Sequence, residues 1–269
     1  MGSTKSFVEF TIVGVGASAG GIESFKRFLG NIPENSNMAF ILVQHLSPSH
    51  ESILPKILTQ STKIPLQEIT NDCDLEPNHI YVIPENKMLQ VIDYKLKLSP
   101  RKKNDIHMPI DVFFSSMERV HGKLAAGVIL SGSVRDGTLG LRDIKEHEGF
   151  TFAETPESAS WDGMPKSAIE AGVVDFIFLP EHIPQKLIEV YGSYKRTSET
   201  EGDNTEVNED ALKTILAVIR QKSGVDFSYY KKPTILRRID RRMAINQMAK
   251  YKDYHVFLRE NKIEQEALF

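Results

Sequence analysis

A glycine-rich turn near the start of the chain could carry two kinds of chemistry. The run Gly14-Val15-Gly16-Ala17-Ser18-Ala19-Gly20-Gly21 follows a buried apolar stretch and precedes an amphipathic segment. As the pattern G-x-S-x-G, it predicts a sharp strand-to-helix turn that projects the Ser18 hydroxyl as a nucleophile. As the pattern G-x-G-x-x-A, it fits a loose dinucleotide-binding fingerprint. An ordinary helix N-cap is a third interpretation of Ser18.

The dinucleotide interpretation needs an acidic residue at the end of the second strand to hold the ribose. That strand ends in Gln44-His45, where no Asp or Glu stands. The fingerprint is therefore incomplete, and a dinucleotide enzyme stays an alternative that predicts thermal stabilisation by NAD.

A nucleophilic serine needs a base and an acid at the same edge of the sheet. Among the eight histidines, only His45 directly follows a predicted strand, and the second strand of such a sheet normally lies beside the first. Asp136 follows the strand Ala125–Leu130 in a glycine-rich loop and could hold the imidazole in one tautomer. Ser18, His45 and Asp136 therefore predict a Ser-His-Asp triad.

The chain order of these three residues excludes one well-known hydrolase fold. α/β-Hydrolases have the order Ser, Asp, His and place several strands before the nucleophile. Here the order is Ser, His, Asp, and the serine follows the first strand. We expect the same catalytic logic on a different fold.

The elements that must position these residues alternate between strand and helix. The predicted strands are Phe10–Val15, Ala39–Gln44, Ala125–Leu130, Thr151–Ala153 and Val173–Phe178. The predicted helices are Gly21–Leu29, Glu51–Gln60, Asp111–Val120, Gly137–Glu146 and Pro165–Ala171. This alternation predicts an α/β fold with a mainly parallel sheet and helices on both faces. The short runs Ile80–Ile83, Leu89–Asp93 and Lys95–Leu98 predict antiparallel hairpins at one edge.

The C-terminal part predicts a separate, all-α domain. Asp210–Lys222, Thr234–Ala244 and Lys250–Arg259 have helical periodicity without strand patterns. The polar stretch Ser193–Asn208 has almost nothing to bury and predicts a solvated linker. We therefore expect a catalytic domain over 1–192, a linker over 193–208 and a helical domain over 209–269.

The composition sets wider limits. The 269 residues are 41% hydrophobic and 26% charged, which excludes a disordered or fibrous chain. The single cysteine, Cys73, excludes a disulfide framework, and no apolar run is long enough for membrane insertion. No His, Asp or Glu cluster has metal-ligand spacing, so we expect no metal site. Met1–Ser6 matches a myristoylation pattern, but a plain polar leader is the simpler explanation. We expect a cytoplasmic protein.

The predicted helix Thr234–Ala244 carries a dense group of cations. Its apolar residues would bury one stripe and leave four arginines along the flanks: Arg237, Arg238, Arg241 and Arg242. A solvated cationic face is one interpretation. Nucleic-acid binding is disfavoured, because the stretch is short and lacks interleaved aromatic residues.

Residues 8–192 resemble the chemotaxis receptor methylesterases (CheB). Four stretches carry the resemblance, in the family's order and spacing: Gly14–Gly21, Gln44–Pro48, Gly127–Gly140 and Gly163–Ala168. The resemblance implies hydrolysis of glutamate γ-methyl esters on chemoreceptor helices, and in some members glutamine deamidation, with no cofactor. It implies Ser18 as nucleophile, His45 as general base and Asp136 as orienting acid.

The same resemblance implies an oxyanion site in two loops. We expect its backbone N–H donors at Ala19 and Gly20 in the nucleophile turn, and at Gly132 and Ser133 in the loop before Asp136. The family usually has Thr and Met where this chain has Ala19 and Ser133. A catalytically lapsed receptor-binding scaffold is therefore the alternative. The family's N-terminal receiver domain has no room before Phe10, so we expect no phosphorylation control in cis.

The C-terminal part resembles the N-terminal helical domain of the receptor methyltransferases (CheR). Four stretches carry this resemblance: Ser223–Phe227, Tyr230-Lys231, Thr234–Met243 and Tyr251–Leu258. The whole is similar to the front part of a methylesterase-methyltransferase fusion. The resemblance implies that the four arginines dock to acidic receptor helices. S-adenosylmethionine would serve only a methyltransferase catalytic domain, which we expect after Phe269.

Overall fold

The computed structural model describes residues 10–45, 53–101, 108–199, 205–227 and 230–268. The predicted leader Met1–Ser6 and the first two residues of the predicted helix Glu51–Gln60 lie outside these ranges. The chain forms two compact units, Met1–Gln185 and Lys186–Phe269. Within the described ranges, no helix combines the length and the apolar character needed to cross a bilayer.

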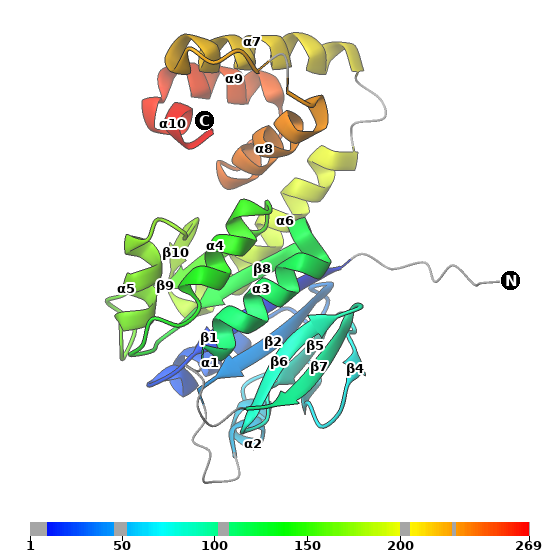
Figure 1. Cartoon of the computed structure of the whole chain (residues 1–269), viewed down its shortest axis with the longest axis vertical. Helices are drawn as coiled ribbons and strands as arrows, with labels where there is room; N and C mark the ends of the chain where they lie inside the picture. Colours follow the sequence, from blue (N-terminus) through cyan, green and yellow to red (C-terminus); the bar gives the residue numbers. More distant parts are fainter. Residues whose placement is uncertain (1–9, 46–52, 102–107, 200–204, 228–229, 269) are drawn as a thin grey trace, which may run out of the picture. The chain divides into compact units, whose positions relative to one another are not determined.

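The N-terminal unit is built on a seven-stranded parallel sheet with the order β10-β9-β8-β1-β2-β5-β3 (Figure 1). Its strands are β1 (Thr11–Ala17), β2 (Met38–Gln44), β3 (Leu66–Glu68), β5 (His79–Val82), β8 (Ala125–Ile129), β9 (Phe150–Glu154) and β10 (Phe176–Phe178). The central strands β8, β1 and β2 are buried along almost their whole length, as parallel strands covered on both faces must be. The predicted α/β class is confirmed.

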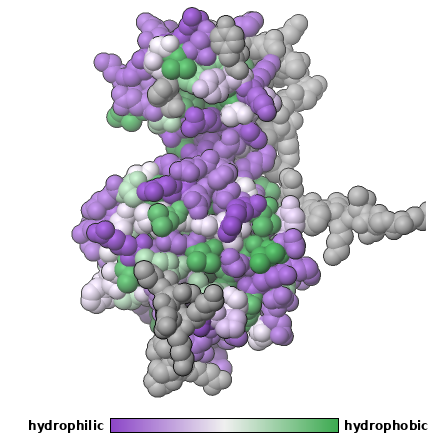
Figure 2. Space-filling view, viewed as in Figure 1, coloured by the Kyte–Doolittle hydropathy of each residue, from purple (hydrophilic) through white to green (hydrophobic). Residues whose placement is uncertain are grey.

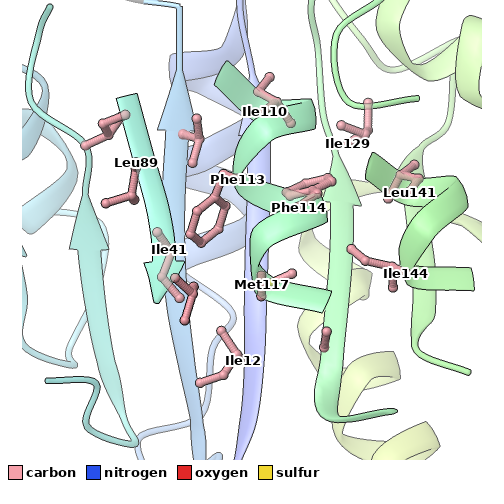
Figure 3. Close-up of a cluster of buried hydrophobic side chains, with 14 of the residues drawn as sticks. Ile12, Ile41, Leu89, Ile110, Phe113, Phe114, Met117, Ile129, Leu141 and Ile144 are labelled. Carbon is pink, nitrogen blue, oxygen red and sulfur yellow. The ribbon is translucent and has the colours of Figure 1, made fainter. Parts of the chain in front are cut away.

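Helices cover both faces of this sheet. They are α1 (Gly21–Leu29), α2 (Leu54–Thr59), α3 (Pro109–His121), α4 (Thr138–Glu146) and α5 (Gly163–Glu170), with 3₁₀ turns η1 (Gly122–Leu124) and η2 (Pro180–His182). Successive side chains of β2 point to opposite faces. Phe40 packs edge-on against Phe28 of α1, with ring centroids 5.9 Å apart. Ile41 instead joins the core cluster under α3 (Figure 3).

Helix α3 lies unusually close to the sheet. Its apolar face carries four buried residues at helical spacing: Ile110, Phe113, Phe114 and Met117 (Figure 3). A Cβ added at Gly16 of β1 would stand 2.5 Å from a methyl carbon of Ile110, and one at Gly14 would stand 2.7 Å from the Phe114 ring. Glycine at these two positions therefore lets α3 pack directly onto β1, next to the end of the strand that carries Ser18.

The region predicted as edge hairpins is divided between two sheets. β5 belongs to the main sheet, where it pairs parallel with β2 and β3. The prediction of a hairpin strand over Ile80–Ile83 is therefore wrong. The reason is burial, since Ile80, Tyr81 and Val82 are all covered, which is typical of a parallel strand. β6 (Lys87–Ile92) and β7 (Lys95–Pro100) do form an antiparallel hairpin, which joins β4 (Cys73–Asp74) in a separate three-stranded sheet.

The second unit is helical. Its helices are most of α6 (Ile183–Glu199), then α7 (Thr205–Ser223), α8 (Lys232–Ile245), α9 (Tyr251–Glu260) and α10 (Lys262–Leu268). Buried residues of α7, α8 and α9 share one small core, which includes Ile215, Met243 and Tyr254. The predicted linker Ser193–Asn208 is helical where it is described, because α6 continues to Glu199 and α7 begins at Thr205.

Candidate active site

Ser18 stands in a tight turn between β1 and α1. Gly20 precedes the helix with φ of 73°, a left-handed conformation that glycine adopts without strain. A Cβ there would lie 2.6 Å from the Ser160 side chain and 2.8 Å from Oγ of Ser131. The Ser18 N–H donates to the carbonyl oxygen of Ser131 at 2.9 Å. The turn is therefore fixed by a neighbouring loop as well as by its own backbone.

His45 follows the end of β2, beside the nucleophile turn. β1 and β2 pair in parallel with Ala17 opposite Gln44, so the next residues along each strand are Ser18 and His45. His45 Nδ1 lies 3.2 Å from Ser18 Oγ, which is within hydrogen-bond reach. The imidazole is half-buried, with 22% of its side chain exposed. It therefore contacts the serine while remaining open to a substrate.

Asp136 reaches the other side of the same imidazole. It lies in the loop between β8 and α4, and β8 flanks β1 on the side opposite to β2. Its fully buried carboxylate lies 2.8 Å from His45 Nε2 through Oδ2. The same carboxylate accepts the backbone N–H groups of Ile110 and Asp111, both at 2.9 Å. The positive end of α3 thus stabilises the negative charge of Asp136.

The structure thus brings Ser18, His45 and Asp136 together at the ends of three adjacent strands. Because a carboxylate only accepts hydrogen bonds, Nε2–H donates to Asp136, and Nδ1 is left to accept the proton of Ser18. In the common serine-protease triad the two ring nitrogens have the opposite roles. Because either nitrogen of an imidazole can accept a proton, the arrangement retains general-base chemistry.

A buried acid that we did not predict supports the nucleophile turn. Glu154, the last residue of β9, accepts the N–H of Ser131 at 3.0 Å and is fully buried. The Ser131 hydroxyl donates to the carbonyl of Ala19 at 2.9 Å and accepts the N–H of Trp161 at 3.0 Å. The sequence did contain a signal for this residue, because Glu154 directly follows a predicted strand, as His45 does.

The predicted oxyanion donors differ in availability. Gly132 lies against Ser18, but its N–H donates to the Trp161 carbonyl at 2.8 Å and cannot bind an oxyanion. A Cβ at Gly132 would lie 2.0 Å from the Met164 sulfur, so the position needs glycine for space. Within the described ranges, the N–H groups of Ala19, Gly20 and Ser133 donate to no acceptor. These three groups can serve as donors, and the prediction for Gly132 is corrected.

A metal site and a dinucleotide site would each need acidic or other ligand side chains at this edge of the sheet. Among the described residues, no group of three or more His, Cys, Asp or Glu side chains could hold a metal ion. The ribose-binding acid of a dinucleotide site is also missing, since β2 ends at Gln44, whose side chain donates to the Ser18 carbonyl at 3.4 Å. What the site contains is a hydrogen-bonded hydroxyl, imidazole and carboxylate.

Comparison with known proteins identifies the group to which this arrangement belongs. Residues 13–187 match the CheB methylesterase family. The chain belongs to the CheB methylesterase family. Residues 210–269 match the all-alpha domain of CheR methyltransferases. A crystal structure of the Thermotoga maritima CheB methylesterase catalytic domain is similar, with a TM-score of 0.62 and 29% identity, over 68% of this chain and 100% of that one.

Two relatives show the extent of the similarity. A protein-glutamate methylesterase/protein-glutamine glutaminase of Photorhabdus laumondii is 32% identical over 169 residues, which is 61% of this chain and 48% of the relative. An uncharacterized 104.1 kDa protein of Rhodobacter capsulatus is 28% identical over 236 residues, which is 80% of this chain and 25% of the relative. This chain therefore spans about a quarter to a half of these relatives.

In the CheR-like helices, only part of the predicted docking face is accessible. Arg237 and Arg238 of α8 are exposed. Arg241 is 7% exposed, and Nε of Arg242 donates to Glu264 of α10 at 2.8 Å. The prediction that all four arginines face a partner is therefore wrong for Arg241 and Arg242, because Arg241 is buried and Arg242 is paired with Glu264.

Proposed function

We propose that the N-terminal unit is a serine hydrolase that removes methyl groups from glutamate γ-methyl esters on chemoreceptor helices, and that it also deamidates glutamine side chains. The observation that carries this proposal is the hydrogen-bonded line from Ser18 through His45 to Asp136. Membership of the CheB methylesterase family supports the choice of ester, and the relatives' printed activities support deamidation.

The first half of the reaction forms an acyl-enzyme. The Ser18 oxygen attacks the ester carbonyl while Nδ1 of His45 accepts the serine proton. Asp136 stabilises the resulting imidazolium through Nε2. The tetrahedral oxyanion binds to backbone N–H groups of Ala19 and Ser133, and collapse releases methanol after His45 returns the proton to the leaving oxygen.

The second half restores the enzyme. His45 takes a proton from water, the hydroxide attacks the acyl carbonyl, and the ester bond to Ser18 breaks with proton return to the serine. The products are a glutamate side chain and methanol. General-base assistance contributes roughly 10²- to 10⁴-fold, and each oxyanion donor contributes about 3 kcal/mol. All the groups that these steps need belong to the chain itself.

The CheR-like helices are proposed to bring the substrate near. Arg237 and Arg238 present exposed guanidinium groups that can pair with carboxylates on acidic receptor helices. Because such receptor helices lie in the cytoplasm, we propose that the protein acts there. Neither nucleic acid nor a lipid bilayer is required as a partner.

The test compares wild type with Ser18→Ala on a receptor-helix peptide that carries a glutamate methyl ester. Methanol release by wild type should exceed that by the variant at least ~10³-fold, because removal of the nucleophile leaves only residual catalysis. Ser99→Ala, which changes an exposed serine on β7, is the matched control and should retain the wild-type rate. Equal rates for wild type and Ser18→Ala would instead support the receptor-binding scaffold.

A further inference from the structure

Two buried carboxylates beside His45, those of Asp111 and Asp136, each accept backbone N–H groups at the start of a neighbouring helix. The N-cap residues of α3 and α4, Met108 and Gly137, make no side-chain capping hydrogen bond. A helix start leaves N–H groups that need acceptors. For α3 the acceptor is Asp136, which immediately precedes the N-cap of α4 and takes the N–H groups of Ile110 and Asp111. The acid of the triad is thus also the cap of α3.

The reverse contact comes from Asp111, the third residue of α3. Its Oδ1 accepts the N–H of Gly140, in the first turn of α4, at 2.8 Å. Asp111 is only 7% exposed. The helices can approach this closely because residue 140 is glycine: a Cβ there would lie 2.4 Å from Cβ of Phe114. The start of α3 is therefore hydrogen-bonded to Asp136, which lies just before α4, and the start of α4 is hydrogen-bonded to Asp111 of α3.

The charges of Asp111 and of the triad residue Asp136 act on each other. Burial raises the pKa of Asp111 to about 6, and the neighbouring charge of Asp136 acts in the same direction. The N–H groups at the start of α4 oppose this rise in pKa. Among the described residues, Asp136 is the charged group that acts on Asp111, and His45 lies directly beyond it. Near pH 7 the Asp111 carboxyl is mostly ionised.

We propose that Asp111 is a positioning residue of the esterase site. It holds the first turn of α4 against α3, fixes the Asp136 carboxylate on the N–H groups that bind it, and so keeps the His45 imidazole in line with the serine. The substrate does not touch Asp111, because helices cover it. The inference rests on the esterase function proposed above.

The test uses Asp111→Asn in the complete chain. The amide keeps the shape and one acceptor oxygen but removes the charge and places an N–H₂ group where a second acceptor stood. We expect kcat to fall roughly 10- to 100-fold, since a displacement of ~1 Å in such a site costs on the order of 10²-fold. KM should stay within about twofold.

The pH profile separates positioning from general loosening. The wild type loses the Asp111 charge as the pH falls through about 6, whereas asparagine carries no charge at any pH, so the acid limb of kcat/KM should move to lower pH. A purely structural defect would lower the profile without moving this limb. The matched control is Asp143→Asn, because Asp143 of α4 accepts the Ser115 hydroxyl of α3 and joins the same helices away from the triad. It should keep wild-type kcat and pH profile.

Each outcome decides the inference. A wild-type kcat and acid limb in Asp111→Asn, or equal losses in Asp143→Asn, would overturn it. If wild type hydrolyses no faster than Ser18→Ala, the esterase proposal fails instead. In that event the rate at which a fluorophosphonate labels Ser18 still tests the positioning role, and labelling should be slower in Asp111→Asn than in wild type and in Asp143→Asn.

Discussion

Asp136→Asn is the change that tests the proposed proton-transfer line most directly. The wild-type carboxylate accepts three N–H groups: Oδ2 takes those of His45 and Ile110, and Oδ1 takes that of Asp111. Asparagine offers one oxygen and one N–H₂ group. If the oxygen replaces Oδ1, the amide donates to Nε2 of His45 and forces the tautomer with a proton on Nδ1, which cannot then accept the proton of Ser18.

The opposite amide orientation keeps the correct tautomer but leaves the Asp111 N–H facing another donor. It also removes the charge that stabilises the imidazolium in the transition state. From both effects we expect kcat/KM to fall on the order of 10⁴-fold, which corresponds to about 5 kcal/mol of barrier. One buried N–H without an acceptor should reduce the free energy of unfolding by about 2 kcal/mol.

The assay is methanol release from the methyl-esterified peptide, together with urea unfolding followed by tryptophan fluorescence. The matched control is Asp175→Asn. Asp175 is another fully buried carboxylate of the same unit, and its Oδ2 lies 3.1 Å from the Thr151 nitrogen. This control should lose similar stability and keep its activity. A folded Asp136→Asn protein that retained kcat/KM within tenfold of wild type would refute the assigned role of Asp136.

Two further changes test other features. Burial lowers the pKa of His121 to about 4, so the unfolded chain binds a proton that the folded chain excludes, and stability falls as the pH drops from 6.5 towards 4. His121→Phe should remove up to about 3 kcal/mol of this pH dependence in urea titrations, and an unchanged slope would contradict the reasoning. Trp161 is 56% exposed, and its ring would lie 3.2 Å from a Cβ at Gly20. Trp161→Ala should raise KM roughly 5- to 30-fold with kcat within about twofold, and an unchanged KM in the peptide assay would exclude a substrate contact.

The positions of the triad residues could be anticipated because parallel strands deliver their carboxyl ends to one edge. Ser18 and His45 each follow a long apolar run, and such runs are recognisable in the sequence. The register that pairs Ala17 with Gln44 could not be deduced. The orientation of the imidazole depends on side-chain packing, which periodicity does not report.

One element that was missed, α10, is held by non-local contacts. α10 has few apolar residues, and its Ile263 is 79% exposed. What holds it is Glu264, which is 3% exposed and bonds to Arg242 and to the Tyr254 hydroxyl. Nothing in the local sequence marks such a buried pair. The hydrogen bond from the Gly132 N–H to the Trp161 carbonyl also joins residues far apart in the sequence, so it could not be predicted either.

The surface around the N-terminal unit is mixed rather than uniformly polar. On the face shown in Figure 2, hydrophobic side chains form small separate patches among hydrophilic ones. The large exposed side chains include Ile53, Leu139 and Trp161. Isolated apolar residues are common on protein surfaces, and Trp161 differs from the others because it adjoins the nucleophile turn.

Ser131 links the Trp161 segment to the nucleophile turn by hydrogen bonds. Its carbonyl accepts the Ser18 N–H, its hydroxyl accepts the Trp161 N–H, and its own N–H is anchored by Glu154. A displacement of the Trp161 segment would therefore reach the Ser18 backbone through one residue. The Ser18 backbone is thus held through contacts from β9 and from the Trp161 segment, which lie more than a hundred residues away in the sequence.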